Sequence, residues 1–140
     1  MVRKFALIFG IIYLVVGVMG FIPGIARPAP VSPDLEVNAE RFGLLLGLFP
    51  INFWHNIVHL AIGLWGVLGS RTVSGAVLFS RGIAIFYGLL AILGLIPVTD
   101  TLFGLVPIYS HDVWLHALSA LIAAYFGFVA PRGAPKPSRA

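Results

Sequence analysis

The sequence contains no cysteine and very little charge. Among its 140 residues none is Cys and only 10% are Asp, Glu, Lys or Arg, whereas about a quarter of the residues of a soluble protein are charged. The absence of Cys excludes disulfides, iron–sulfur clusters and thiolate metal sites. A hydrophobic content of 59% indicates that lipid surrounds most of the chain. The length leaves room for one compact domain.

The sequence also lacks the motifs of common enzyme classes. Ser80, Ser110 and Ser119 have no nucleophile-elbow motif around them, and no Gly-rich phosphate loop occurs. The net charge of +4 does not indicate a nucleic-acid partner, because the basic residues lie at the chain ends and at helix boundaries. We therefore predict no catalytic residue and no binding to nucleic acid.

Four apolar stretches approach the length of about 20 residues that crosses a bilayer. The expected helices cover about residues 5–22, 52–69, 73–96 and 111–130, and Pro or Gly residues lie near their ends. We predict an all-α fold, a polytopic membrane four-helix bundle in a single domain. A long outer loop, residues 24–49, joins the first two helices, and residues 131–140 form a basic, Pro-rich tail. The apolar runs 42–49 and 102–106 are too short to span and are expected to lie at the outer surface.

The Lys and Arg residues predict the orientation in the membrane. Arg3 and Lys4 precede the first expected helix, Arg71 lies between the second and third, and the tail carries further basic residues. Basic residues favour the cytoplasmic side. Both termini are therefore expected in the cytoplasm, with the loops 24–49 and 98–109 outside.

An internal repeat divides the chain into two helical hairpins. Residues of the first expected helix recur 74 positions later in the third, and residues of the second recur 57 positions later in the fourth. The matched pairs are Tyr13 and Tyr87, Pro23 and Pro97, Pro50 and Pro107, and His59 and His116. Both hairpins run in the same direction, so we predict a parallel repeat about an axis along the membrane normal. The repeat also argues that the first helix is not a cleaved signal peptide.

All four His residues lie near the outer ends of the second and fourth expected helices. His55 and His59 are spaced i,i+4, which places both on one helix face, and Asp112 and His116 have the same spacing. The repeat aligns His59 with His116 and His55 with Asp112. We predict that these four residues form two layers one helical turn apart and that His111 points elsewhere.

Several chemistries fit this cluster. The three imidazoles and one carboxylate could hold zinc, iron or another divalent metal ion. His59 and His116 could instead be axial ligands of a haem or ligands to the magnesium of a (bacterio)chlorophyll. A third possibility is proton transfer. Asn56, Tyr13 and Tyr87 are predicted to support the ligands.

A purely structural interpretation stands beside these. The same side chains could make interhelical hydrogen bonds, each worth about 1 kcal/mol or less in a membrane. A stripe of small residues continues along the same helix faces, and it permits either close helix contact or a slot for a flat ligand. Its members are Gly63, Gly66, Ala120, Ala123 and Gly127.

The segment from Gly47 to Gly63, G-L-F-P-I-N-F-W-H-N-I-V-H-L-A-I-G, resembles the signature of domain-of-unknown-function family 4383. The run from Asp112 to His116, D-V-W-L-H, is similar to the second His motif of that family. The resemblance implies a small bacterial four-helix membrane protein in the cytoplasmic membrane. It draws attention to His55, Asn56, His59 and His116 and implies no activity.

Three functions remain open from the sequence. The first is a non-catalytic binding or accessory protein that ligates a metal ion or a tetrapyrrole. The second is a structural or assembly subunit that contacts other membrane subunits or forms a homo-oligomer, and the weakest is a proton-coupled carrier. In each case the lipid bilayer is the expected surrounding.

Overall fold

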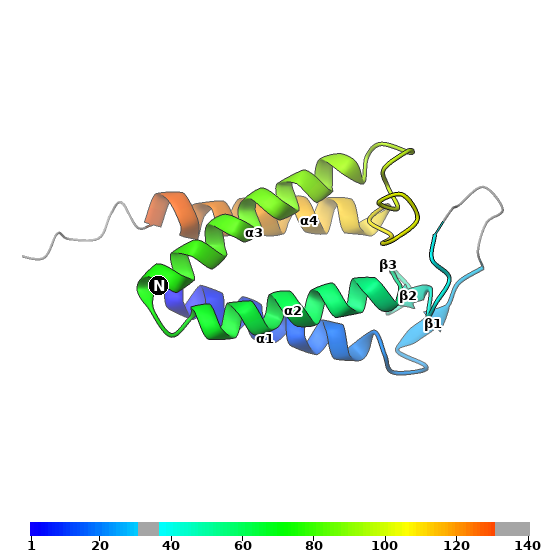
Figure 1. Ribbon diagram of the computed structural model, residues 1–140, viewed down its shortest axis with the longest axis horizontal. Coiled ribbons are helices and arrows are strands. Elements are labelled where there is room, and N and C mark those ends of the chain that lie inside the picture. Colours follow the sequence, from blue (N-terminus) through cyan, green and yellow to red (C-terminus); the bar gives the residue numbers. More distant parts are fainter. Residues whose placement is uncertain (31–36, 131–140) are drawn as a thin grey trace, which may run out of the picture.

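The computed structural model describes residues 1–30 and 37–130. Within them the chain forms four long helices and three short strands (Figure 1). The predicted tail 131–140 and residues 31–36 of the predicted outer loop lie outside the described residues. In chain order the elements are α1 (Val2–Met19), β1 (Ala26–Pro28), β2 (Gly43–Leu45), β3 (Phe49–Ile51), α2 (Phe53–Gly69), α3 (Val73–Leu93), α4 (His111–Ala124) and the π-helical turn η1 (Tyr125–Val129).

The four helices form two hairpins that lie side by side. Helix α1 packs along α2, α3 packs along α4, and α3 also contacts α1 and α2. The described chain begins and ends at one end of the bundle, which also holds the turn between α2 and α3 (Figure 1). We call this the turn end and the opposite end, which carries the three strands, the strand end. The prediction of a mostly helical protein with four helices is confirmed.

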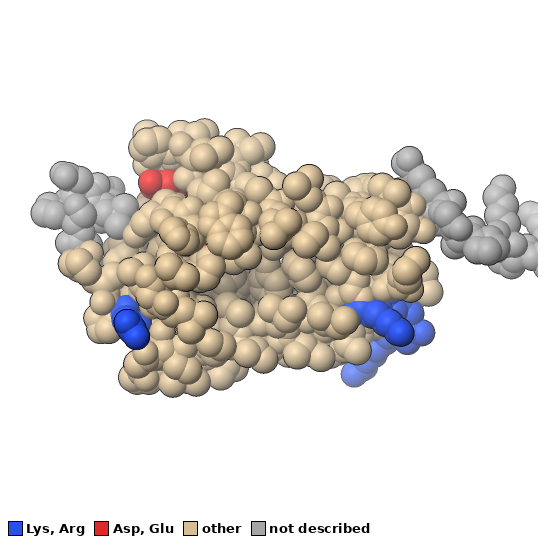
Figure 2. Space-filling model, turned by 180° about the vertical axis from the view of Figure 1, so that it is seen from behind, with Lys and Arg blue, Asp and Glu red and all other residues tan. Residues whose placement is uncertain are grey.

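Three of the helical segments are long and apolar enough to cross a membrane, namely Val2–Met19, Val73–Leu93 and His111–Val129. Helix α2 is also apolar but has 17 residues, which corresponds to about 25 Å and lies at the short end of the spanning range. Large apolar side chains such as those of Ile8, Ile85 and Leu121 are exposed on the outward faces. Figure 2 shows no charged atom in the middle of one face. Such a surface is suited to lipid, so this is a membrane protein.

Helix α1 begins at Val2, three residues before the expected start at 5, and two helices end earlier than predicted. Helices α1 and α3 end at Met19 and Leu93, each three residues before the expected ends at 22 and 96. The next residues make tight turns instead, since the N–H groups of Ile22 and Ile96 donate to the carbonyl oxygens three residues earlier. Pro23 and Pro97 follow these turns, and Pro disfavours helical geometry in the residue before it.

The strand end was not predicted. The predicted outer loop 24–49, together with residues 50 and 51, contains an antiparallel sheet in the order β1-β2-β3. Leu46 and Gly47 have φ values of 54° and 75°, and this left-handed backbone reverses the chain between β2 and β3. The all-α prediction therefore holds for the four helices but is wrong for this end of the molecule.

The stripe of small residues makes close helix contacts. A Cβ atom added at Gly63 of α2 would lie 2.6 Å from the backbone nitrogen of Leu14 in α1, and one added at Gly10 would lie 2.6 Å from the backbone nitrogen of Val67. The two backbones can approach this closely only because both positions are Gly. Ala120 and Ala123 of α4 are buried in the core. The stripe is thus occupied by helix packing and leaves no slot for a flat ligand.

Candidate functional site

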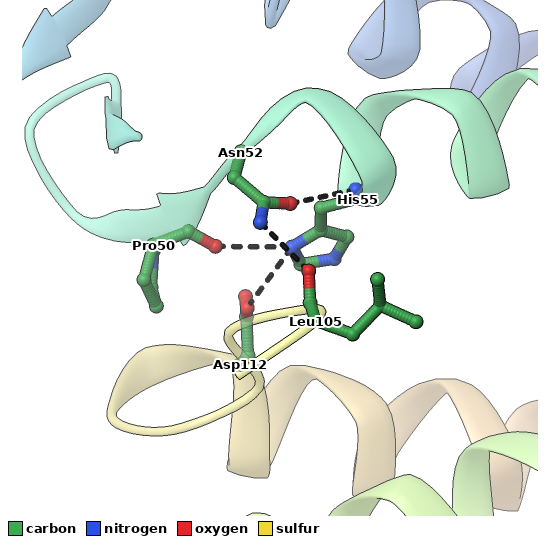
Figure 3. A network of polar contacts seen from close by, with 5 residues as sticks. All are labelled: Pro50, Asn52, His55, Leu105 and Asp112. Atoms are coloured by element: carbon green, nitrogen blue, oxygen red, sulfur yellow. Dashed lines mark hydrogen bonds and ion pairs between the residues drawn. The ribbon is translucent and has the colours of Figure 1, made fainter. Parts of the chain in front are cut away.

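Asn52 fixes the start of α2 at the strand end. Its side-chain oxygen accepts a hydrogen bond from the backbone N–H of His55 at 2.9 Å, so it caps the helix. Its side-chain nitrogen donates to the carbonyl oxygens of Leu105 at 2.8 Å and Asn38 at 3.2 Å. Asn52 is fully buried, and Figure 3 shows how it links the start of α2 with the loop before α4. The position of the first site residue on α2 is therefore fixed by both hairpins.

His55 lies between the two hairpins. Its Nδ1 atom is 3.1 Å from the carbonyl oxygen of Pro50 and 3.8 Å from Oδ2 of Asp112 in α4 (Figure 3). A carbonyl can only accept a hydrogen bond, so Nδ1 carries the proton and Nε2 of a neutral ring does not. His55 and Asp112 are both buried. The structure thus brings these two predicted ligands close together.

His59 and His116 each lie beside a tyrosine. The ring centroids of His59 and Tyr13 are 5.2 Å apart, and those of His116 and Tyr87 are 4.8 Å apart. The two Tyr rings are 5.6 Å apart. The His55 ring lies 4.6 Å from that of His59 and 6.4 Å from that of His116. All four helices therefore contribute an aromatic ring to one cluster.

The cluster does not form a closed metal centre. Within residues 1–30 and 37–130, no three His, Asp or Glu side chains are grouped so that they could hold a metal ion. Metal ligation by His55, His59, Asp112 and His116 would require side chains to rotate toward a common point. That ligand set stays a prediction.

Several polar atoms of the cluster have no hydrogen-bond partner among the described residues. They are Nδ1 of His59, Nδ1 of His116, Oδ2 of Asp112 and the hydroxyl of Tyr87. A buried polar group without a partner costs about 1–3 kcal/mol. The side chains of the cluster therefore do not satisfy one another, and a water molecule or a ligand would be needed to do so.

Asn56 lies apart from this arrangement. It is fully buried, and both polar atoms of its side chain have no partner among the described residues. The side chain packs against Gly20 of α1. Among the described residues Asn56 makes no hydrogen bond to a His side chain, and its supporting role stays a prediction.

A cavity of about 380 Å³ lies between α1 and α4 on the strand-end side of the bundle. Figure 2 shows the hollow on the face formed by these two helices. Its wall is mainly apolar, and strands β2 and β3 contribute to it. The lining residues are Phe9, Ile12, Tyr13, Val16, Met19, Leu45, Leu46, Phe49, Ile51, His59, Asp112, Leu115, His116, Leu118, Ser119 and Ile122. The predicted ligands His59, Asp112 and His116 are thus among its few polar side chains.

The family model described as Domain of unknown function (DUF4383) matches residues 3–129. The chain belongs to this family. The match confirms the resemblance noted in the sequence, and it covers all four helices and the whole cluster. Comparisons with curated proteins and with solved structures find no match. For this DUF4383 protein the function must be argued from its own residues.

Two residues of the candidate site, Asn52 and Ser119, were not predicted from the sequence. Asn52 directly precedes α2 and is of a residue type that caps helices, so its capping bond was predictable, although its bond to Leu105 was not. Ser119 follows His116 by three positions and lies on the same helix face.

His111 was expected to point elsewhere, and it is exposed and lies against Phe49, with ring centroids 6.1 Å apart.

Proposed function

We propose that this DUF4383 protein is a non-catalytic binding protein of the membrane and that the imidazoles of His59 and His116 hold its ligand. One observation carries the proposal. Both rings line the same largely apolar cavity, and both have a buried Nδ1 atom without a partner. The two Nδ1 atoms do not reach the cavity surface, so the rings would have to turn to bond a ligand, and such bonds would offset the cost of leaving the nitrogens unpaired.

A tetrapyrrole is the first candidate ligand. The iron of a haem or the magnesium of a (bacterio)chlorophyll takes imidazole as an axial ligand, and His59 and His116 reach the cavity from α2 and α4. The wall, which includes Phe9 and Leu115, is apolar like a macrocycle, and its volume of about 380 Å³ would take one edge of the ring system. Tyr13 and Tyr87, beside the two His rings, would orient them.

A divalent metal ion is the second candidate. The His55 ring donates from Nδ1 to a carbonyl oxygen at 3.1 Å, which is the common arrangement of a metal-bound His whose Nε2 is the ligand. Asp112 lies 3.8 Å from that ring. Rotation of the His59, Asp112 and His116 side chains would complete the set.

Spectroscopy and metal analysis test both candidates. The protein is purified from its membrane, its absorption spectrum is recorded and its metal content is measured. We expect a Soret or Q band, or a stoichiometric metal, that His59→Ala and His116→Ala remove. His111→Ala is the matched control, because His111 is exposed and outside the cluster. Absence of any such band and of any stoichiometric metal would exclude both ligands.

A structural or assembly role is the alternative. The side-chain bond from Asn52 to Leu105 links the two hairpins without any ligand, and this observation supports a structural use of polar groups at the strand end. This role predicts that the protein co-purifies with other membrane subunits or as a homo-oligomer. A stable isolated monomer would count against it.

A proton-coupled carrier remains the third candidate, and transport unaffected by a pH gradient and by His59→Ala would remove it.

We also propose that the hairpins are copies of each other and that the turn end faces the cytoplasm of a bacterial cell. The contact between the matched residues Tyr13 and Tyr87, whose ring centroids are 5.6 Å apart, supports a repeat. Arg3 donates from Nε to the carbonyl oxygen of Ser70 at 2.8 Å, so the start of α1 lies beside the turn after α2. Arg3, Lys4 and Arg71 therefore lie together at the turn end. Basic residues favour the cytoplasmic side.

A further inference from the structure

We infer that the cavity between α1 and α4 takes a neutral amphiphile from the bilayer, with a carbonyl or hydroxyl head at the imidazoles and a hydrocarbon tail that leaves between the two helices. This inference rests on the proposed function, in which His59 and His116 bind a ligand. It names a ligand class other than a metal ion or a tetrapyrrole.

The opening of the cavity supports entry from lipid. Ile12 of α1 and Leu118 of α4 line the cavity and are 49% and 48% exposed, so they form its rim. The rim lies on the face in which Figure 2 shows the hollow and no charge in the middle. In a membrane this face contacts acyl chains. A hydrocarbon tail can therefore pass between α1 and α4 without meeting water.

The strands cover part of the strand end of the cavity. Leu45 of β2 and Ile51 of β3 line it and are almost completely buried, whereas Leu46 in the turn between them also lines it and is 59% exposed. Strand β3 leads directly into Asn52, whose side chain is bonded to Leu105 and Asn38. The route between α1 and α4 crosses no hydrogen bond of this network.

The polar part of the wall indicates a neutral head. No Lys or Arg lines the cavity in the described part of the chain, so a phosphate head would have no counter-charge. The imidazoles of His59 and His116 and the hydroxyls of Tyr13 and Ser119 can each donate or accept a hydrogen bond. The carboxyl group of Asp112 also lines the cavity and disfavours an anionic head. These groups match a carbonyl or hydroxyl, as on a lipid-soluble quinone.

The size of the cavity also fits this class. Its volume of about 380 Å³ is at the lower end of the range for ligand pockets, about 300–1,000 Å³. A single ring and the first part of a tail would fill it. The remainder of a long tail would lie along the outward faces of α1 and α4.

Photolabelling tests the inference. The protein in phosphatidylcholine nanodiscs is exposed to a benzoquinone that carries a decyl chain with a diazirine, and labelled peptides are mapped by mass spectrometry. We expect labelling of α1 and α4 that an excess of untagged decyl-benzoquinone suppresses. Labelling that the untagged quinone does not reduce, or that headless decane suppresses equally, overturns the inference. Stronger suppression by a decyl quaternary ammonium overturns the neutral head.

Matched variants locate the site. Ile12→Trp places a bulky ring at the rim and should cause a several-fold loss of suppressible labelling. Ile11→Trp is the control, because Ile11 has nearly the same exposure, 48%, but does not line the cavity. His116→Leu should cause a similar loss. If His116→Leu does not fold, Ile12→Trp against Ile11→Trp decides alone, and equal labelling of these two overturns the inference.

The absorption spectrum and metal content of the same preparation separate the two proposals. A His-dependent Soret band or metal without quinone-suppressible labelling overturns the inference and leaves the proposed function standing. Suppressible labelling without band or metal supports both and identifies the ligand class. Absence of all three removes both.

Discussion

The side-chain nitrogen of Asn52 donates to the carbonyl oxygen of Leu105 at 2.8 Å, across 53 positions of the chain. The same side chain caps α2 through its oxygen. One buried amide thus connects the start of the second helix of one hairpin with the loop of the other. The geometry of the cluster beneath it depends on this connection.

Asn52→Ala should destabilise the protein by about 1–3 kcal/mol, because it removes the cap and leaves the carbonyl of Leu105 without this donor. The measurement is the free energy of unfolding in detergent by denaturant titration. Asn38→Ala is the control, since the Asn38 side chain is exposed and its one hydrogen bond among the described residues is to the nearby N–H of Glu40. Equal effects of the two substitutions would contradict the role of Asn52.

Gly63→Val should separate α1 from α2. The new Cβ atom would lie 2.6 Å from the backbone nitrogen of Leu14, so the helices must move apart, at a cost of about 1–3 kcal/mol. The same unfolding titration measures it. Ala61→Val introduces the same side chain at an exposed position of α2 and should have little effect. A fully stable Gly63→Val variant would show that the close approach is not required.

Tyr87→Phe should leave the ligand-free protein as stable as the wild type, or more stable by about 1 kcal/mol. The Tyr87 hydroxyl is buried without a partner among the described residues, and removing such a group removes its desolvation cost. Thermal unfolding of the purified variant measures the effect, with Tyr125→Phe as an exposed control. Loss of more than about 1 kcal/mol would indicate that the hydroxyl bonds a retained ligand or water.

The absence of native Cys allows a direct test of orientation. Thr72→Cys places a thiol at the exposed turn end, and Val98→Cys places one at the strand end, where Val98 is 75% exposed. In intact bacterial cells, a membrane-impermeant maleimide should label only Val98→Cys. Both variants should react once the membrane is permeabilised. Labelling of Thr72→Cys in intact cells would reverse the proposed topology.

The helices could be predicted because their signal is long. Apolar runs between Pro and Gly residues placed α2 within one residue of its observed start and end. The strands could not be predicted, since each has three residues, too few for an alternating pattern. Their turn also uses a positive φ at Leu46, a residue type that does not indicate such a conformation.

Part of the site could be predicted from helical spacing and the repeat. These two patterns placed His55 and Asp112 near each other. In the structure Nδ1 of His55 lies 3.8 Å from Oδ2 of Asp112. The cavity could not be predicted, because it depends on how far the two hairpins diverge between α1 and α4. The position of Asn56 was also hidden, since it depends on the close approach of Gly20 to α2.

The hydrogen bonds of Asn52, which directly follows β3, affect how any occupant of the cavity would be exchanged. If the cavity takes its ligand from the bilayer as inferred, a strand end bonded to Leu105 and a rim formed by Ile12 and Leu118 would let molecules exchange by lateral diffusion within the leaflet. Occupancy would then follow the mole fraction of the compound among the lipids and not its concentration in the buffer. Extended washing in excess detergent would empty the protein, whereas extraction with a native lipid belt would keep its cargo.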